Sequence, residues 1–123
     1  MKQLTKAEEQ VMMILWEIKE GIVKDIIEKM TDPKPAYNTV STVIRVLEGK
    51  KFVDHKAYGN SYVYYPLVAE KDYKRFAFDK VMSTYFGNSY EHLVSFLVNE
   101  KKLSISELEE LTRLAEQLKN KKP

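Results

Sequence analysis

The chain has 123 residues, of which 44% are hydrophobic and 31% charged, a composition typical of a small globular domain with an appendage. It contains no cysteine, which excludes disulfides, thiolate nucleophiles and cysteine-ligated metal sites. Its 20 basic and 18 acidic side chains give a net charge of +2, so the chain is not one that binds nucleic acid by bulk charge.

No apolar stretch is long enough for a membrane-spanning helix, which needs about 18 such residues. The first ten residues are polar and charged, and they lack the apolar segment of a secretory signal. We therefore expect a cytoplasmic protein without membrane insertion.

Two amphipathic helices are predicted first along the chain. Thr5 and Glu8 have the spacing of a capping box, in which each side chain accepts a hydrogen bond from the other residue's backbone N–H. The apolar residues that follow recur at steps of three and four: Val11, Ile14, Leu15 and Ile18. Gly21 is expected to end this helix, and a short second helix follows within 22–30. The prolines at 33 and 35 exclude its continuation.

A third helix is predicted to begin near Tyr37 or Asn38. At 100° per residue its apolar positions fall on one side of the helix: Val40, Val43, Ile44 and Leu47. The opposite side carries Asn38, Thr42 and Arg45, with Ser41 at its flank. Amide, hydroxyl and guanidinium groups on the outer face of a short helix are suited to reading base edges.

The pattern then changes to that of a β-hairpin. Residues 52–56 and 61–65 are rich in β-branched and aromatic side chains, and the Gly59-Asn60 pair between them suits a tight turn. Three short helices and a hairpin are the order of a winged helix, with the hairpin as the wing. Residues 34–63 include five basic and two acidic side chains, so this stretch carries a net charge of +3.

The aromatic residues of the hairpin have two interpretations. Trp16 and the tyrosines at 62, 64 and 65 either pack against the helices or form a platform on which bases stack. Alternating aromatic residues on a hairpin favour packing.

Beyond Pro66 the chain is predicted to form helices that pair two copies of the protein. One helix spans 70–86 and ends at Gly87-Asn88, Ser89 caps a second, and Ser104 with Glu107 opens a third by a capping box. These helices have too few partners within one chain to bury their apolar faces, so a second copy is expected to cover them. The expected dimer contacts are Tyr73, Phe76, Val81, Leu93, Phe96, Leu97, Leu108, Leu111, Leu114 and Leu118.

Several segments in order carry a family resemblance over nearly the whole length. They are Leu4-Thr5-Lys6-Ala7-Glu8 with Val11-Met12 and Leu15-Trp16, residues 39–44 with Leu47-Glu48, Phe52-Val53, residues 62–66 and residues 93–104. Together they resemble the BlaI/MecI/CopY penicillinase-repressor family of winged-helix transcriptional regulators. The expected fold is mainly α with a small β-hairpin wing: a winged helix-turn-helix domain over 1–68 and a helical dimerisation arm over 69–123.

The chain departs from the family pattern at two places. The family usually has Thr then Arg before the Leu of the recognition helix, where this chain has Arg45 then Val46. It tends to have Lys-Lys-Gly before the wing, where this chain has Gly49-Lys50-Lys51. The arginine thus lies on the face of Asn38 and Thr42, and the operator sequence does not carry over from other members.

The resemblance implies a dimeric repressor that binds a palindromic operator, typically of resistance genes. In the β-lactam-responsive branch a membrane sensor triggers proteolytic cleavage in the dimerisation region. The matching bond here is Phe96-Leu97, where the family's best-known junction is Asn-Phe. The Cys-x-Cys ligands of the copper-responsive branch are absent, which excludes copper sensing by that route.

The predicted DNA contacts are Asn38, Thr39, Ser41, Thr42, Arg45, Lys50, Lys51, Lys56 and Tyr58. Among them Arg45 is suited to guanine, and the lysines are suited to phosphates. No enzyme constellation is present, so we predict no catalytic, cofactor or metal site; His55 and His92 show no second ligand at metal-binding spacing. The alternative function is a winged-helix protein–protein interaction module without DNA binding, which the near-neutral charge leaves open.

Overall fold

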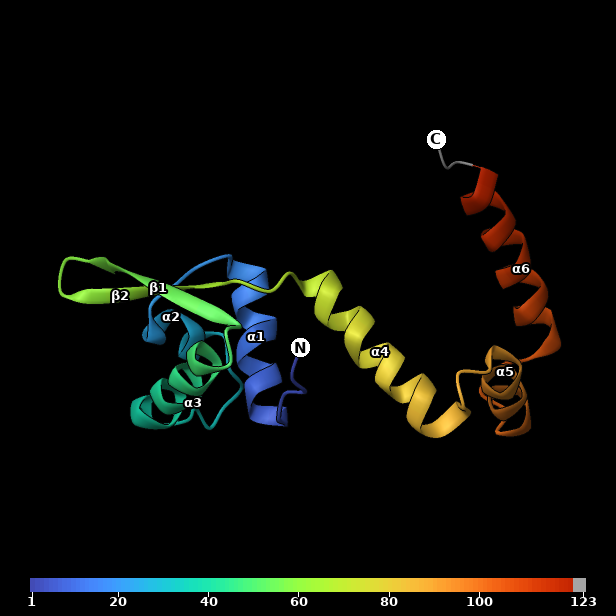
Figure 1. Cartoon of the computed structure of the whole chain (residues 1–123), viewed down its shortest axis with the longest axis horizontal. Helices are drawn as coiled ribbons and strands as arrows, with labels where there is room; N and C mark the ends of the chain where they lie inside the picture. The colour runs from blue at the N-terminus through green and yellow to red at the C-terminus, as the bar shows by residue number, and fades with distance from the viewer. Residues whose placement is uncertain (121–123) are drawn as a thin grey trace. The chain divides into compact units, whose positions relative to one another are not determined.

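The computed structural model describes residues 1–120, which form six helices and one two-stranded antiparallel sheet (Figure 1). The elements are α1 (Lys6–Ile18), α2 (Val23–Glu28), α3 (Tyr37–Gly49), β1 (Val53–Tyr58), β2 (Ser61–Pro66), α4 (Glu70–Phe86), α5 (Tyr90–Asn99) and α6 (Ile105–Asn120). Three helices, a hairpin and further helices confirm the predicted mainly α, winged-helix fold. Of the predicted dimerisation arm, residues 121–123 lie outside the described part. Contacts divide the chain into two compact units, Met1–Ala77 and residues 78 onward.

The N-terminal unit is held together by one hydrophobic core that α1, α2, α3 and the hairpin share. The apolar residues predicted from helical spacing form its centre, and five are at most 2% exposed: Val11, Leu15, Val40, Ile44 and Leu47. Phe52, between α3 and the wing, is equally buried. Each such side chain contributes about 1.5–3 kcal/mol by leaving water, so this core is the main force that positions α3.

The end of α1 differs from the prediction. The helix ends at Ile18, and Lys19 after it adopts φ 77°. Gly21 instead pairs with Tyr64 of β2: its N–H donates to the Tyr64 carbonyl at 3.0 Å, and its carbonyl accepts from the Tyr64 N–H at 2.8 Å. A Cβ on Gly21 would lie 2.9 Å from Cδ1 of Ile18. The small size of Gly21 therefore suits the close packing between Ile18 and Asp25 beside its bridge to the wing, and Gly21 is not the residue that ends the helix.

The wing is a regular hairpin in which Tyr58 pairs with Ser61 across a two-residue turn. Gly59 adopts φ 60°, and a positive φ at the first of the two turn residues is typical of a type II′ turn. Tyr64 faces the core and is buried, which confirms the packing interpretation for this tyrosine. Tyr62, by contrast, is 55% exposed, and Tyr58 at the tip is 76% exposed.

The first half of α4 belongs to the N-terminal unit because Tyr73 is buried there. Its hydroxyl accepts a hydrogen bond from the Leu4 N–H at 3.1 Å and donates one to Oε2 of Glu9 at 3.0 Å. Its ring lies 5.7 Å from the ring of Phe52 and 6.0 Å from that of Trp16. The predicted dimer contact by Tyr73 is therefore wrong, since its own chain covers the ring and hydroxyl.

Phe76 lies one turn further along α4 and packs, half-buried, against the same core, and its predicted dimer contact stays a prediction. Before α4, the indole N–H of Trp16 donates to the carbonyl of Val68 at 2.8 Å. These contacts extend the compact unit to Ala77, nine residues past the boundary expected at residue 68.

The C-terminal unit leaves most of its apolar side chains exposed. Ser89 caps α5 by accepting from the His92 N–H at 3.2 Å, and Ser104 and Glu107 form the predicted capping box of α6. The rings of Phe86 and Phe96 lie 5.7 Å apart and join α4 to α5. Neither α5 nor the described length of α6 contains a fully buried residue. Within residues 1–120, no helix is both long and apolar enough to cross a bilayer.

Candidate nucleic-acid interface

The outer face of α3 exposes polar side chains that its buried face holds in place. Asn38, Thr42 and Arg45 are exposed, as the 100° spacing predicts. Nη2 of Arg45 donates to the Ser41 hydroxyl at 3.3 Å, which steadies the guanidinium on the helix surface. The Thr42 hydroxyl donates to the Asn38 carbonyl at 2.8 Å, so its lone pairs remain free to accept from outside.

The first turn of α3 has no side-chain cap on its backbone donors. Ala36 occupies the N-cap position, and its side chain has no polar atom that caps the helix. The Thr39 N–H donates to the Ala36 carbonyl at 3.1 Å, so the backbone donors left for a phosphate or water in this turn are those of Tyr37 and Asn38. A shallow hollow next to this turn is lined by Lys24 of α2, Tyr37, and Asn60 and Tyr62 of the wing. The first turn of α3 and the wing therefore border one continuous surface.

Lys50 is already paired within the chain. Its ammonium donates to Oε1 of Glu8 at 2.7 Å, and the two side chains are 22% and 7% exposed. Burial raises the pKa of Glu8, but hydrogen bonds from Lys50 and Thr5 outweigh it and leave that pKa below its ordinary 4.5. The predicted phosphate contact by Lys50 stays a prediction, and it would have to form while the ammonium keeps its bond to the buried Glu8 carboxylate.

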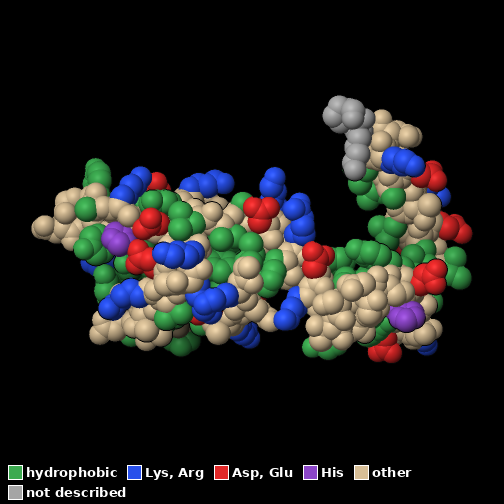
Figure 2. Space-filling view, in the orientation of Figure 1, with side chains coloured by type: hydrophobic (Ala, Val, Ile, Leu, Met, Phe, Trp, Pro, Cys, Tyr) green, Lys and Arg blue, Asp and Glu red, His purple; other side chains and the backbone are tan. Residues whose placement is uncertain are grey.

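Two more basic residues of the 34–63 stretch have local partners. Lys34 donates to the carbonyls of Glu28 and Met30 at the end of α2, at 3.1 and 2.6 Å. Lys56 pairs with Glu20 at 3.1 Å, but both side chains are at least half exposed, so water or a phosphate can replace this contact. On the face in view in Figure 2, basic and acidic side chains are interspersed over the N-terminal unit.

Arg45 and Lys51 are the exposed basic residues of this stretch that have neither an ion pair nor a backbone carbonyl partner among the described residues. Lys51 adopts φ 68° just after α3, where the Phe52 N–H donates back to the Leu47 carbonyl at 3.0 Å. This is the left-handed position that favours glycine at helix ends. In the family that this chain resembles, the Lys-Lys-Gly pattern has glycine at the position of Lys51. The lysine here therefore adds a positive charge at a backbone conformation that is strained for any residue but glycine.

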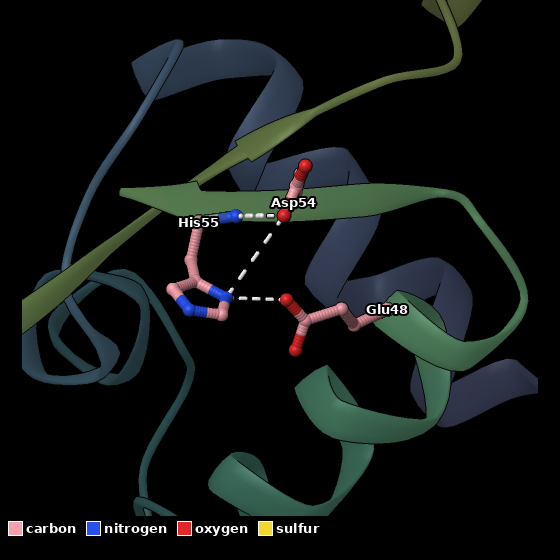
Figure 3. Close-up of side chains that lie close together, drawn as sticks. All are labelled: Glu48, Asp54 and His55. Atoms are coloured by element: carbon pink, nitrogen blue, oxygen red, sulfur yellow. Dashed lines mark hydrogen bonds and ion pairs between the residues drawn. The ribbon is translucent and has the colours of Figure 1, made fainter. Parts of the chain in front are cut away.

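A cluster that the sequence reasoning missed lies where α3 meets the wing (Figure 3). Nδ1 of the His55 ring contacts Oε2 of Glu48 and lies 4.0 Å from Oδ1 of Asp54. The same Asp54 oxygen accepts a hydrogen bond from the backbone N–H of His55 at 2.8 Å. The expectation that His55 has no carboxylate at ligand spacing was wrong. Seven residues separate Glu48 from His55, and the turn from α3 into β1 closes that distance.

The remaining predicted dimer residues are all in the C-terminal unit. Exposure is 42–57% for Val81, Phe96, Leu111, Leu114 and Leu118, and intermediate for Leu93, Leu97 and Leu108. The bond between Phe96 and Leu97 lies inside α5. These positions all lie in the C-terminal unit. Helices α5 and α6 carry all of them except Val81, which is in α4.

Comparison with known proteins places the chain in a family. The family model described as penicillinase repressor matches residues 4–117. The methicillin resistance regulatory protein MecI of Staphylococcus aureus strain N315 is 31% identical over 113 residues, 91% of this chain and 92% of MecI. The penicillinase repressor of Bacillus licheniformis is 24% identical over 121 residues, 98% of this chain and 94% of the relative.

Solved structures agree with these sequence relatives. The solution structure of the DNA-binding domain of the repressor BlaI has a TM-score of 0.51 and 26% identity, over 58% of this chain and 88% of that domain. Monomeric Bacillus licheniformis BlaI in complex with the blaP half-operator has a TM-score of 0.50 and 26% identity, over 58% and 89%. The relatives are named as repressors and regulators, which agrees with the prediction that the chain is not an enzyme. The chain belongs to the penicillinase repressor family.

Proposed function

We propose that this chain is a dimeric, sequence-specific DNA-binding repressor that acts in the cytoplasm on a palindromic operator. The observation that carries the proposal is the exposed polar face of α3, on which Arg45 donates a hydrogen bond to Ser41. Support comes from the likeness to BlaI, whose structure was solved with a half-operator. A helix in this position enters the major groove in helix-turn-helix proteins.

The side chains divide into base-reading and backbone-binding groups. Arg45 pairs with O6 and N7 of a guanine, and Asn38 is suited to an adenine edge or to a phosphate. The hydroxyls of Thr39, Ser41 and Thr42 bind phosphates or base edges next to them. On the wing side, Lys51, Lys56 and Tyr58 contact the sugar-phosphate backbone, as does Lys50 while it keeps its bond to Glu8. Because few free cations remain, affinity depends strongly on the base contacts.

The C-terminal unit is proposed to pair two chains. The apolar side chains of α5 and α6 have no fully buried member among the described residues, so folding of one chain leaves their burial incomplete. The contacts are Val81, Leu93, Phe96, Leu97, Leu108, Leu111, Leu114 and Leu118. Such pairing presents two copies of α3 to half-sites about one helical turn apart.

Release from the operator is proposed to follow cleavage at Phe96-Leu97 by a membrane sensor and protease system, with a resistance-type operon as the regulated target. The relatives named as methicillin resistance regulators support this target. The bond lies in α5, so a protease needs that helix to unwind locally. The low burial of α5 makes such unwinding inexpensive.

The test is binding of the full chain to the DNA upstream of its own coding region, measured by fluorescence anisotropy over a salt series. We expect a discrete, salt-dependent complex that survives excess nonspecific competitor. Arg45→Ala is expected to lose about 1–3 kcal/mol of specific affinity, whereas Arg113→Ala, on α6, leaves affinity unchanged. The absence of any salt-sensitive complex would favour the protein-interaction module instead.

A second variant tests the role of the C-terminal unit. A chain that ends at Ala77 keeps the contacts of Tyr73 and Phe76, and we expect it to fold, to remain monomeric and to bind the operator much more weakly. Dimerisation of this truncated chain would overturn the proposed role of α5 and α6.

A further inference from the structure

We propose that Glu48, Asp54 and His55 form a zinc-class divalent cation site whose occupation strengthens DNA binding. One ligand atom from each side chain lies within 4.8 Å of the other two, and Figure 3 shows Nδ1 of His55 directed at both carboxylates. The three residues come from two elements, since Glu48 is in the last turn of α3 and the others are in β1. The part of the proposal that concerns DNA rests on the proposed function.

The donor set fits zinc and similar ions. One imidazole nitrogen and two carboxylate oxygens are ligands that Zn²⁺ accepts, and three protein ligands leave a fourth position for water. Ligands bound at 2.0–2.2 Å in tetrahedral geometry lie about 3.3–3.6 Å apart. Nδ1 of His55 contacts Oε2 of Glu48 and lies 4.0 Å from Oδ1 of Asp54, so an ion would enter as the Glu48 carboxylate moves away from the imidazole and the Asp54 carboxylate moves toward it.

The charge at this cluster is uncompensated. Across residues 1–120, neither Glu48 nor Asp54 has a lysine or arginine within ion-pair distance, and the imidazole is their shared partner. Of the lysines on either side of the cluster in the sequence, Lys50 binds Glu8 and Lys56 binds Glu20, and Arg45 bonds to Ser41 rather than to Glu48. A divalent ion would neutralise both carboxylates at once.

The surroundings hold the ligands while leaving them accessible. The His55 ring packs 4.4 Å from the Tyr62 ring and 5.7 Å from that of Tyr64, which limits its rotation. The side chains of Glu48, Asp54 and His55 are 28%, 52% and 33% exposed, so an ion can enter from solvent. An outer packing shell of this kind orients ligands in metal sites.

The position of the cluster connects it to the DNA-facing surface. Glu48 is three residues after Arg45 and seven after Ser41, so all three lie along one face of α3. Two unneutralised carboxylates at that face repel phosphates. A bound cation removes this repulsion and ties the end of α3 to the wing, and both effects favour the DNA complex.

The first experiment measures zinc binding without DNA, by competition with a chromophoric chelator on the full, tag-free chain. We expect one ion per chain and a loss of affinity of at least about tenfold in His55→Ala and Glu48→Gln. The matched control is His92→Ala, which removes the other of the two histidines and should bind as the original chain does. Absence of stoichiometric binding, or equal loss in His92→Ala, would overturn the site.

Folding of each variant is checked by thermal unfolding, and Asp54→Asn, at a more exposed position, replaces any variant that does not fold. The second experiment compares operator affinity with zinc and with chelator. We expect zinc to raise affinity at least about fivefold in the original chain and not in His55→Ala. Zinc binding without a change in affinity would overturn the coupling. Failure to bind DNA under any condition would instead count against the proposed function, while the chelator titration still decides the site.

Discussion

Replacing Tyr73 by phenylalanine tests whether α4 is anchored in the N-terminal unit or serves to pair two chains. The change removes the hydroxyl and keeps the ring, so the contacts with Trp16 and Phe52 remain. What is lost are two hydrogen bonds, from the Leu4 N–H at 3.1 Å and to Glu9 at 3.0 Å. Glu9 is partly exposed and can turn to water, whereas the Leu4 N–H loses its partner in a buried place.

An unsatisfied buried donor costs about 1–3 kcal/mol. For a unit of this size each kcal/mol corresponds to a decrease in Tm of about 4–8 °C, so we expect a decrease of at least about 4 °C. Thermal unfolding gives the decrease in Tm, and urea unfolding gives the loss of free energy of unfolding. The fluorescence of Trp16 reports both for the N-terminal unit, because Trp16 is the single tryptophan of the chain and its ring is 6.0 Å from that of Tyr73.

The control is Tyr85→Phe, at a side chain that is 75% exposed, which should change stability by less than about 0.5 kcal/mol. Dissociation of the proposed dimer should be the same in both variants when measured by sedimentation. A Tyr73→Phe chain with unchanged urea unfolding but weaker dimerisation would refute the anchoring and restore the dimer contact that the sequence pattern predicts.

Three further predictions concern charge, backbone conformation and assembly. Because the pKa of Glu8 is lowered on folding, its stabilisation is present above about pH 4.5 and is lost as the pH falls through the lowered value. Lys50→Met should therefore destabilise the chain at neutral pH and progressively less in acid, and a pH-independent difference in urea midpoints would contradict the pairing. Lys51→Gly relieves φ 68° and should raise stability by about 1 kcal/mol while reducing the slope of log affinity against log salt by about one; a loss of stability would show that the strain is absent. Leu114→Glu should convert the proposed dimer to a monomer in sedimentation and leave the Trp16 unfolding curve of the N-terminal unit unchanged, and a persisting dimer would argue against a place for Leu114 in the interface.

Much of the fold could be predicted because its signals are local. The capping boxes at Thr5 and Ser104 join residues three apart, and both form as expected. The Gly59-Asn60 turn and the helical spacing of the core residues are likewise decided within a few positions. The same spacing separates the outer polar face of α3 from its buried face, so the side of α3 that bears the candidate DNA contacts could be predicted too.

Side-chain partners far apart in the chain followed no such local signal. Lys50 binds Glu8 across 42 positions, and Tyr73 binds Leu4 across 69. An exposed lysine and a lysine that neutralises a buried carboxylate look the same in a sequence, and so do an apolar residue that faces its own core and one that faces a second copy. Local spacing determined which residues form helices and which side each presents. Only the packing of α3, the wing and α4 decided which charges remain free, since that depends on which distant groups burial brings within hydrogen-bond distance.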